Sequence, residues 1–286
     1  MIYFIIDLLL VMNQLCQAAL EGNISLVKQL LETGKGTDIY HMAMISASKG
    51  GHIELVYLLL KHMKSILGVN EYNWAMAHAA EGGHMDIVHL MLNLGANDYN
   101  NSMVYAASGG NIEIVKMMID KSHKKTIAVG GESINNYNLA MEWAAAGGHI
   151  DIVKLMIEKG ANNYNFAMAE AARGGYMDII LLLMKQASLD SVTINAKPIN
   201  YNSSMVWAAY GGHLEVLELI LKHVSKDDVM TNYNLAMVWA SQKGHLDIVQ
   251  LLLNLGANDY NTAIECAKNE DIKRLMQISK DGKNKL

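Results

Sequence analysis

A histidine and an aspartate two positions apart recur along this 286-residue sequence, and such a pair could do acid–base or metal chemistry. The pair stands in "GHIDIV" (148–153) and again in "GHMDIV" (83–88). A histidine near a carboxylate can act as a general base that the acid orients, and the two side chains can also bind a metal ion together. Both roles need an imidazole at this position.

The other copies of the motif argue against both roles. The same position holds histidine in five copies and asparagine or tyrosine in three others. These residues are His52, His84, His149, His213 and His245, and Asn23, Asn111 and Tyr176. A catalytic or metal site would not accept asparagine or tyrosine in place of histidine, whereas a turn would. We therefore expect these side chains to pack in a turn and to hydrogen-bond the neighbouring backbone.

Two other features that could carry function have simpler interpretations. The segment "GKGT" (34–37) lacks the spacing and the preceding strand of a phosphate-binding loop, so we interpret it as a junction. Seven aligned methionines could form a pliable surface, but their fixed place beside alanines predicts a core. They are Met44, Met76, Met103, Met141, Met168, Met205 and Met237. The sequence therefore predicts a protein that is not an enzyme and that binds no cofactor or metal.

Charge and cysteine content narrow the class of partner and the compartment. The net charge is −5, and arginine occurs only at Arg173 and Arg274. The chain therefore has no net positive charge to attract phosphates, and it has few of the arginines that usually contact phosphates and bases. We therefore expect no nucleic-acid binding. Cys16 and Cys266 have no ligand at zinc spacing, and we expect small buried thiols in a reducing, cytoplasmic compartment.

The histidine–aspartate pair belongs to an internal repeat, and this repeat determines which elements hold it. Two small residues, a glycine, a histidine, asparagine or tyrosine, and an apolar–acidic–apolar segment return in the same order. The glycines of this frame are Gly22, Gly51, Gly83, Gly110, Gly148, Gly175, Gly212 and Gly244. A ninth copy at 260–276 lacks the glycine pair. Such self-similarity is the signature of a solenoid.

Each copy predicts two antiparallel helices. In the copy at 137–163, Asn138 is a good N-cap, and alanines and methionine follow at helical spacing. Gly147 and Gly148 end this helix, because glycine adopts the left-handed backbone found just past a helix. The second helix begins near Ile150 and has an apolar face wider than one neighbour could cover. The copies must therefore stack in a row to bury it.

The copies resemble the ankyrin repeat. "AMAHAAEGGHMDIVHLMLNLGAN" (75–97) and "VWASQKGHLDIVQLLLNLGAN" (238–258) are similar to its core, T-P-L-H-x-A-A-x-x-G-H-L-E-I-V-x-L-L-L-x-x-G-A. The resemblance covers residues 13–278 in about nine units. It implies an all-α ankyrin-repeat solenoid of helix-turn-helix units.

The spacing of the copies departs from that family. Gly83 and Gly110 are 27 residues apart in the sequence, whereas the family period is about 33. The resemblance therefore implies shortened β-hairpin fingers. Two other junctions, at 119–136 and 184–200, are long, and we expect extended helix ends with loops there.

The two ends of the sequence differ from the repeats. "MIYFIIDLLLVM" (1–12) lacks the basic region and cleavage site of a signal peptide and is too short to span a membrane. We expect it to be a hydrophobic capping helix or a partial repeat that covers the end of the stack. Residues 279–286 form a short basic tail.

Side chains that change from copy to copy are the candidates for binding a partner. In the ankyrin resemblance, the positions flanking the alanine pair lie on or near the concave face of the first helices. The predicted partner-binding residues are His78, Tyr105, Trp143, Glu170, Arg173, Trp207, Tyr210 and Trp239. Tryptophan, tyrosine and arginine often dominate binding energy between proteins. The alternative is that the tryptophans only fill gaps between adjacent first helices.

These features predict a non-catalytic scaffold that binds a protein partner through its concave face, with a monomer favoured. The recurring "GANDYN" and the lysine-over-arginine composition also resemble ankyrin families of amoeba-infecting giant DNA viruses of the mimivirus type. That resemblance implies a host protein as partner and the host cytoplasm as location. Two alternatives stay open. One is a structural protein that self-associates through residues 1–12, and the other is a substrate adaptor for a ubiquitin ligase, although we expect no recruiting domain at 277–286.

Overall fold

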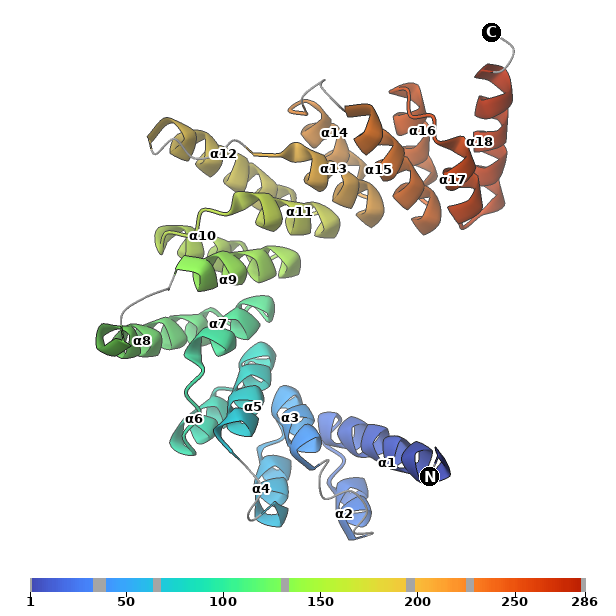
Figure 1. The fold of residues 1–286 in the computed structure, drawn as a ribbon. Helices are drawn as coiled ribbons and strands as arrows, with labels where there is room; N and C mark the ends of the chain where they lie inside the picture. The colour runs from blue at the N-terminus through green and yellow to red at the C-terminus, as the bar shows by residue number, and fades with distance from the viewer. Residues whose placement is uncertain are drawn as a thin grey trace. The chain divides into compact units, whose positions relative to one another are not determined.

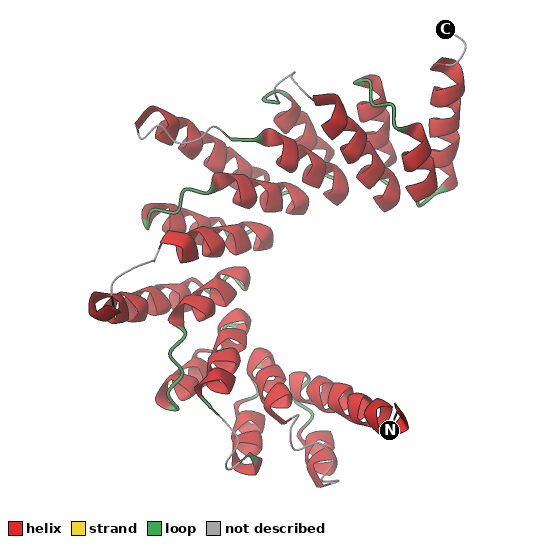
Figure 2. Ribbon diagram, viewed as in Figure 1, coloured by secondary structure: helices red, strands yellow, loops and turns green. Residues whose placement is uncertain are grey.

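A computed structural model describes residues 2–32, 40–63, 68–129, 134–193, 199–224 and 229–283. All regular structure in these ranges is α-helical and no strand occurs among them, as predicted (Figures 1 and 2). The helices are α1 (Ile2–Leu20), α2 (Ile24–Glu32), α3 (Tyr40–Gly50), α4 (Ile53–His62), α5 (Val69–Gly82), α6 (Met85–Asn93), α7 (Tyr99–Ser108), α8 (Ile112–Val129), α9 (Ile134–Gly147), α10 (Ile150–Glu158), α11 (Tyr164–Gly174), α12 (Met177–Thr193), α13 (Tyr201–Gly211), α14 (Leu214–Leu221), α15 (Val229–Lys243), α16 (Leu246–Asn254), α17 (Tyr260–Cys266) and α18 (Glu270–Lys283). The "GKGT" segment lies outside the described residues.

The helices pair in chain order and the pairs stack, which confirms the predicted solenoid. The chain forms two compact units, Met1–Ala140 and Met141–Leu286, here called the N-terminal and C-terminal units. In the N-terminal unit, α1, α3, α5 and α7 lie side by side, and α2, α4, α6 and α8 each pack against the helix before them (Figure 1). In the C-terminal unit, α11, α13, α15 and α17 form the row, with α12, α14, α16 and α18 packed behind them.

The core runs along the interfaces between these helices. The seven aligned methionines are at most 1% exposed, so they are core residues as predicted. The alanines beside them, such as Ala144 and Ala145, are fully buried and let the backbones of neighbouring first helices approach closely. Each second helix contributes an apolar stripe, in α10 formed by Ile152, Val153 and Met156. In a lone helix pair, neither the alanines and methionines of the first helix nor the apolar stripe of the second helix would be fully buried. This is why the copies stack.

The predicted N-cap at Asn138 is wrong. Helix α9 begins at Ile134, so Asn138 lies inside it. In some other copies the cap is the residue before the tyrosine: Asp98 accepts a hydrogen bond from the N–H of Asn101 at 3.1 Å, and Asn200 accepts one from the N–H of Asn202 at 3.0 Å. The asparagine after the tyrosine looked like a cap because its type is right for one. Its role is different.

That asparagine closes the short turns between copies. The Oδ1 of Asn73 accepts hydrogen bonds from the N–H groups of Asn97 at 2.7 Å and Asp98 at 3.0 Å, in the loop that leads to the next first helix. Asn234 does the same 161 positions later for Asn258 at 2.7 Å and Asp259 at 3.1 Å. A side chain thus satisfies loop N–H groups that would otherwise lack a protein partner.

The long junctions and the chain ends follow from helix lengths. Helices α8 and α12 have 18 and 17 residues, against nine in α6 and α10, so both junctions begin as extended helices as predicted. The predicted boundaries after residues 12 and 278 fall inside α1 and α18. The side chains of residues 1–9 are outside the described part, and capping by residues 1–12 stays a prediction. No described helix combines the length and the apolar character that crossing a bilayer requires.

Candidate functional site

The histidines of the recurring turn hold one copy to the copy before it. The Nε2–H groups of His52 and His84 donate to the carbonyl oxygens of Leu20 and Lys49, each at 3.0 Å, and His213 donates to that of Arg173 at 3.1 Å. The expected bond to backbone is therefore present, but it crosses between copies. Sequence spacing could not show this, because donor and acceptor are 32 to 40 positions apart.

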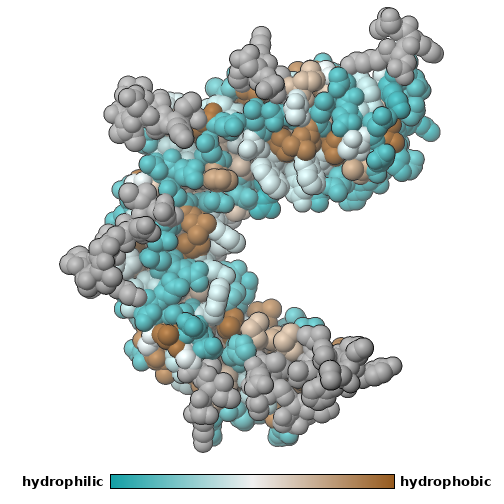
Figure 3. Space-filling view, in the orientation of Figure 1, coloured by the Kyte–Doolittle hydropathy of each residue, from teal (hydrophilic) through white to brown (hydrophobic). Residues whose placement is uncertain are grey.

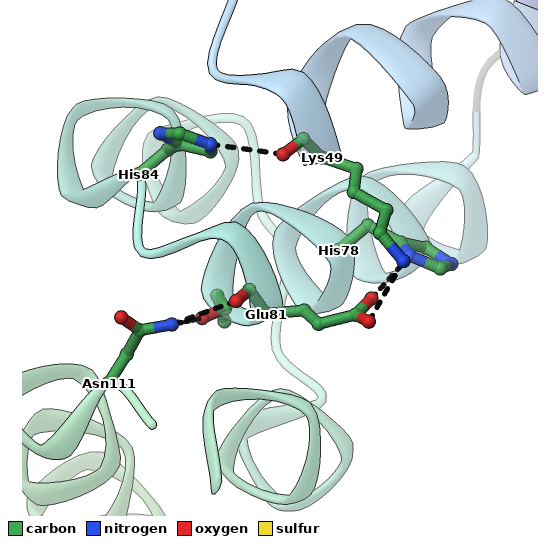
Figure 4. Close-up of polar contacts among 6 residues, drawn as sticks. Lys49, His78, Glu81, His84 and Asn111 are labelled. Carbon is green, nitrogen blue, oxygen red and sulfur yellow. Dashed lines mark hydrogen bonds and ion pairs between the residues drawn. The ribbon is translucent and has the colours of Figure 1, made fainter. Parts of the chain in front are cut away.

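Asparagine and tyrosine replace histidine here for physical reasons. Asn111 Nδ2 donates to the carbonyl oxygens of Ala80 at 2.9 Å and Glu81 at 2.8 Å (Figure 4), so it makes the same kind of contact as the imidazole. The Tyr176 ring lies over Gly148, where an added Cβ would be 2.5 Å from it. Gly148 has φ of 78°, so it must have both a left-handed backbone and no side chain.

The histidine turns thus have a structural role. Among the described residues, no group of three or more histidine, cysteine, aspartate or glutamate side chains could hold a metal ion. The two cysteines are free thiols and partly exposed, not buried as the sequence predicted. Partial burial raises the pKa of the Cys16 thiol, and a hydrogen bond with Ser46 opposes this.

The predicted partner-binding residues all lie on first helices and face solvent to different degrees. Trp143, Trp207 and Trp239 are 46%, 38% and 36% exposed, so they do not belong to the core. Arg173 is also exposed, whereas His78, Tyr105, Glu170 and Tyr210 are half-buried. The tryptophans therefore keep substantial exposed surface, while the tyrosines fill space between helices, as the alternative interpretation proposed for the tryptophans.

One aromatic cluster joins α5 and α7 in the N-terminal unit. The ring centroids of His78 and Tyr105 are 5.0 Å apart in an edge-on arrangement, and Trp74 lies 6.2 Å from Tyr105. Such edge-to-face pairs contribute beyond the area they bury. Trp74 is 46% exposed and was not among the predicted residues.

A whole exposed row was missed together with Trp74. It lies four residues before the predicted row, hence on the same helix face. Its large apolar members are Met42, Trp74, Leu139, Phe166 and Leu235, which are 42% to 59% exposed. The signal was present in the sequence as bulky apolar residues at one fixed frame position. Their alignment with the start of the ankyrin consensus concealed it.

Charged groups beside the first cluster satisfy one another (Figure 4). Glu81 accepts from Lys49 Nζ at 2.8 Å and lies 3.2 Å from His78 Nδ1. Burial lowers the pKa of His78, Glu81 opposes that shift, and Lys49 adds to it. A pocket of about 410 Å³ opens next to this network, between α3 and α5. Its lining is mainly apolar and neutral, and includes Met42, Ile45 and Trp74.

A second cluster joins α13 and α15 in the C-terminal unit. Tyr210 lies between Trp207 and Trp239, with ring centroids 5.3 and 5.6 Å away and edge-on geometry. Lys243 Nζ lies 4.4 Å from the centre of the Tyr210 ring, a cation–π contact. Figure 3 shows a group of strongly hydrophobic residues near α13 and α15, with paler and hydrophilic residues around it.

Between α9 and α11 the same face has a different character. A pocket of about 160 Å³ is lined by Glu142, Trp143, Ala146, Glu170 and Arg173. Arg173 pairs with Glu170, with Nη2–Oε2 at 2.6 Å and Nε–Oε2 at 2.8 Å. Burial raises the pKa of Glu142, and the charge of Glu170 raises it further. Within the described residues Glu142 has no hydrogen bond or ion pair.

Comparison with known proteins adds the family. A model described as "Ankyrin repeats (3 copies)" matches residues 15–103, 103–197 and 168–264. The crystal structure of the human ASB11 ankyrin repeat domain aligns over 71% of this chain and 96% of its own, with a TM-score of 0.47 and 14% sequence identity. No curated protein sequence matches the chain. The family model spans most of the described helix pairs.

Proposed function

The chain belongs to the ankyrin repeat family, and from this premise we propose that it is a non-catalytic scaffold that binds a protein through the concave, aromatic face of its first helices. Ankyrin repeats form protein-interaction scaffolds, and their fold is typically non-catalytic. A repeat frame holds the backbone constant while surface side chains vary, which is how such scaffolds encode a partner.

The observation that carries this proposal is the exposure of large aromatic side chains in a row that varies from copy to copy. Trp143, Trp207 and Trp239 in the predicted row, and Trp74 in the row four residues before it, each expose more than a third of their surface. Apolar area that a partner covers contributes about 25 cal/mol per Å². Tryptophan is among the residue types that most often dominate the binding energy between proteins.

The proposal extends to the class of partner. The lysine-over-arginine composition and the recurring "GANDYN" support an origin in a giant DNA virus of amoebae. The partner is then a protein of the host cytoplasm, and the chain acts as a monomer without nucleic acid.

The test replaces Trp143, Trp207 and Trp239 by alanine together. We expect capture of the partner from an amoeba lysate to fall at least tenfold, because each change removes exposed apolar area that the partner would cover. A tenfold loss of affinity corresponds to a loss of about 1.4 kcal/mol in binding free energy. A matched control replaces Tyr57, Leu181 and Leu246 by alanine, since these large apolar residues are equally exposed but lie on second helices. Capture by the control variant should be unchanged.

Circular dichroism and thermal unfolding of both variants accompany the capture measurement. We expect helical content to be retained in both, with capture performed well below the melting temperature. Unfolding of the triple tryptophan variant would show that these residues are required for the fold, and it would contradict their role as a binding surface. Equal loss of capture in both triple variants would also contradict the proposed surface.

Self-association is a second candidate, because Leu10 on α1 is 62% exposed. Residues 1–12 would then pair two chains. Light scattering of the full chain and of a variant lacking residues 1–12 tests this idea. A dimer that becomes a monomer on truncation would favour assembly, whereas a monomer in both would favour the scaffold.

A further inference from the structure

The pocket between α9 and α11 differs from the rest of the first-helix face in its charge balance. Its lining brings two carboxylates, Glu142 and Glu170, against one guanidinium, that of Arg173. The Nη2 and Nε atoms of Arg173 both contact the same oxygen, Oε2 of Glu170. Glu142 is half-buried and has no counter-charge among the described residues. The pocket is therefore short of one positive charge.

The other part of the lining is the ring of Trp143, which is 46% exposed. Tryptophan offers the best aromatic face for a cation, and the attraction grows when the cation is partly desolvated. A carboxylate beside that ring adds a charge-assisted hydrogen bond from an ammonium or guanidinium group. The volume of about 160 Å³ is that of one side-chain end, since a benzene molecule occupies a cavity of about 150 Å³.

We propose that this pocket receives an arginine or lysine side chain of the protein partner, with its cation between the Trp143 ring and the carboxylate of Glu142. Glu170 supplies a second negative charge to the pocket lining, and its ion pair with Arg173 partly neutralises that charge. The inference rests on the proposed binding function and names the chemistry of one contact within it.

A comparison inside the molecule supports the choice of occupant. In the N-terminal unit Glu81 stands beside an aromatic cluster too, but Lys49 and His78 already pair with it. In the C-terminal unit Lys243 already lies over the Tyr210 ring. In both places the chain's own lysine provides the cation. At Glu142 and Trp143 no described residue does, so an external cation fits there.

The test is a titration that needs no partner. The probe is N-acetyl-arginine amide, followed through the indole N–H signals of the four tryptophans at constant ionic strength. The signals are assigned with single Trp→Phe variants. We expect selective shifts of the Trp143 signal with a dissociation constant on the order of 10 mM, and a similar value for N-acetyl-lysine amide. N-acetyl-citrulline amide, which has the shape of arginine without its charge, should bind at least tenfold more weakly.

Three variants sharpen the assignment. Glu142→Gln should weaken probe binding about tenfold, because it removes the unpaired charge. Arg173→Gln should strengthen it about threefold, because a like charge leaves the pocket. The control Glu158→Gln alters an exposed glutamate on α10 and should leave binding unchanged.

Some outcomes would overturn the inference. They are no Trp143 shift up to about 100 mM probe, equal binding of the citrulline compound, and tighter binding of tetramethylammonium, which cannot donate a hydrogen bond. If any of these occurs while the triple tryptophan variant still loses its partner, the scaffold proposal stands and only the cation contact falls. If the probe binds as expected but the triple variant keeps its partner, the pocket stands and the partner surface lies elsewhere.

Discussion

In each copy, the turn that ends the first helix and the exposed face of that helix are only a few residues apart, yet their side chains serve different ends. At the turns, polar groups bond across to the previous copy, as His84 does to the carbonyl of Lys49. On the face, Trp143, Trp207 and Trp239 leave more than a third of their surface open. Interactions at the turns are satisfied within the chain, whereas on the face these three rings remain partly uncovered.

The face itself shows the same contrast on a smaller scale. Glu81 and Glu142 lie close to aromatic side chains, but only Glu81 has a cationic partner, Lys49. The difference teaches that residue type alone does not decide whether a charged group is paired within the fold or left unpaired. The presence of a counter-charge from a neighbouring helix decides it.

The largest effect should come from filling a glycine of the turn. Gly148→Ala would place a Cβ 2.5 Å from the Tyr176 ring at a φ of 78°. We expect a loss of about 3 kcal/mol in the free energy of unfolding, about 1 from the left-handed backbone and the rest from displacing the ring. Urea unfolding followed by circular dichroism measures this loss.

Gly160→Ala is the control for that change. Gly160 also has a positive φ, 96°, but a Cβ there would meet nothing within 4 Å. Its cost should be the backbone share alone, about 1 kcal/mol. Equal losses at both glycines would show that the turn does not depend on the close approach of the next copy.

In the aromatic cluster of the C-terminal unit, Tyr210 should contribute more to the stability of the fold than Trp207. Tyr210→Ala should lower the free energy of unfolding by about 2 kcal/mol, because its ring contacts Trp207, Trp239 and Lys243. Trp207→Ala should cost about 1 kcal/mol, since one of its sides already faces water. Thermal and urea unfolding of the two variants test the order, and a larger loss for Trp207 would reverse the division.

The asparagine that closes the short turn should matter through its acceptor oxygen. Asn73→Leu keeps the size but removes the acceptor of two N–H groups, and we expect a loss of about 1.5 kcal/mol. Asn73→Asp retains an acceptor and should stay within about 0.5 kcal/mol of the original chain. Hydrogen exchange at the amides of Asn97 and Asp98 should accelerate in the leucine variant only. Acceleration in both would assign the effect to packing.

The smallest effects should have opposite signs at the two glutamates. Glu81→Gln removes the ion pair with Lys49 and alters the contact with His78, and it should cost about 0.5 kcal/mol. Glu142→Gln removes an unpaired charge, and after allowance for its partial exposure should stabilise the fold by a few tenths of a kcal/mol.

The pH dependence of stability gives a second test of Glu142→Gln. Burial and Glu170 raise the pKa of Glu142 in the folded chain above its unfolded value. Its destabilising effect is therefore fully present above the folded pKa and fades as the pH falls through that pKa. The gain from Glu142→Gln should be largest near neutral pH and vanish below the ordinary glutamate pKa of about 4.3. A gain independent of pH would point to shape instead of charge.

Most of the fold could be predicted from the sequence, because its signals are local. The spacing of Ala144, Ala145 and the methionines defined the buried stripe, and Gly148 defined the end of the helix. The error at Asn138 arose because an asparagine can accept a hydrogen bond from its own helix or from a neighbouring loop, and residue type alone does not distinguish them. The exposed row with Trp74 was missed because its residues align with the start of the ankyrin consensus, which does not indicate which side of the helix stays uncovered.

By itself the sequence determined the helices, their pairing and the buried stripes, because helical periodicity and glycine stops act over fewer than ten residues. Only the tertiary structure decided that the histidines bond to the preceding copy, that Tyr210 is enclosed between two tryptophans, and that Glu81 is paired while Glu142 is not. These outcomes depend on distances of a few ångströms between residues about 30 positions apart. A charge or ring is satisfied by whichever group the neighbouring helix brings to it.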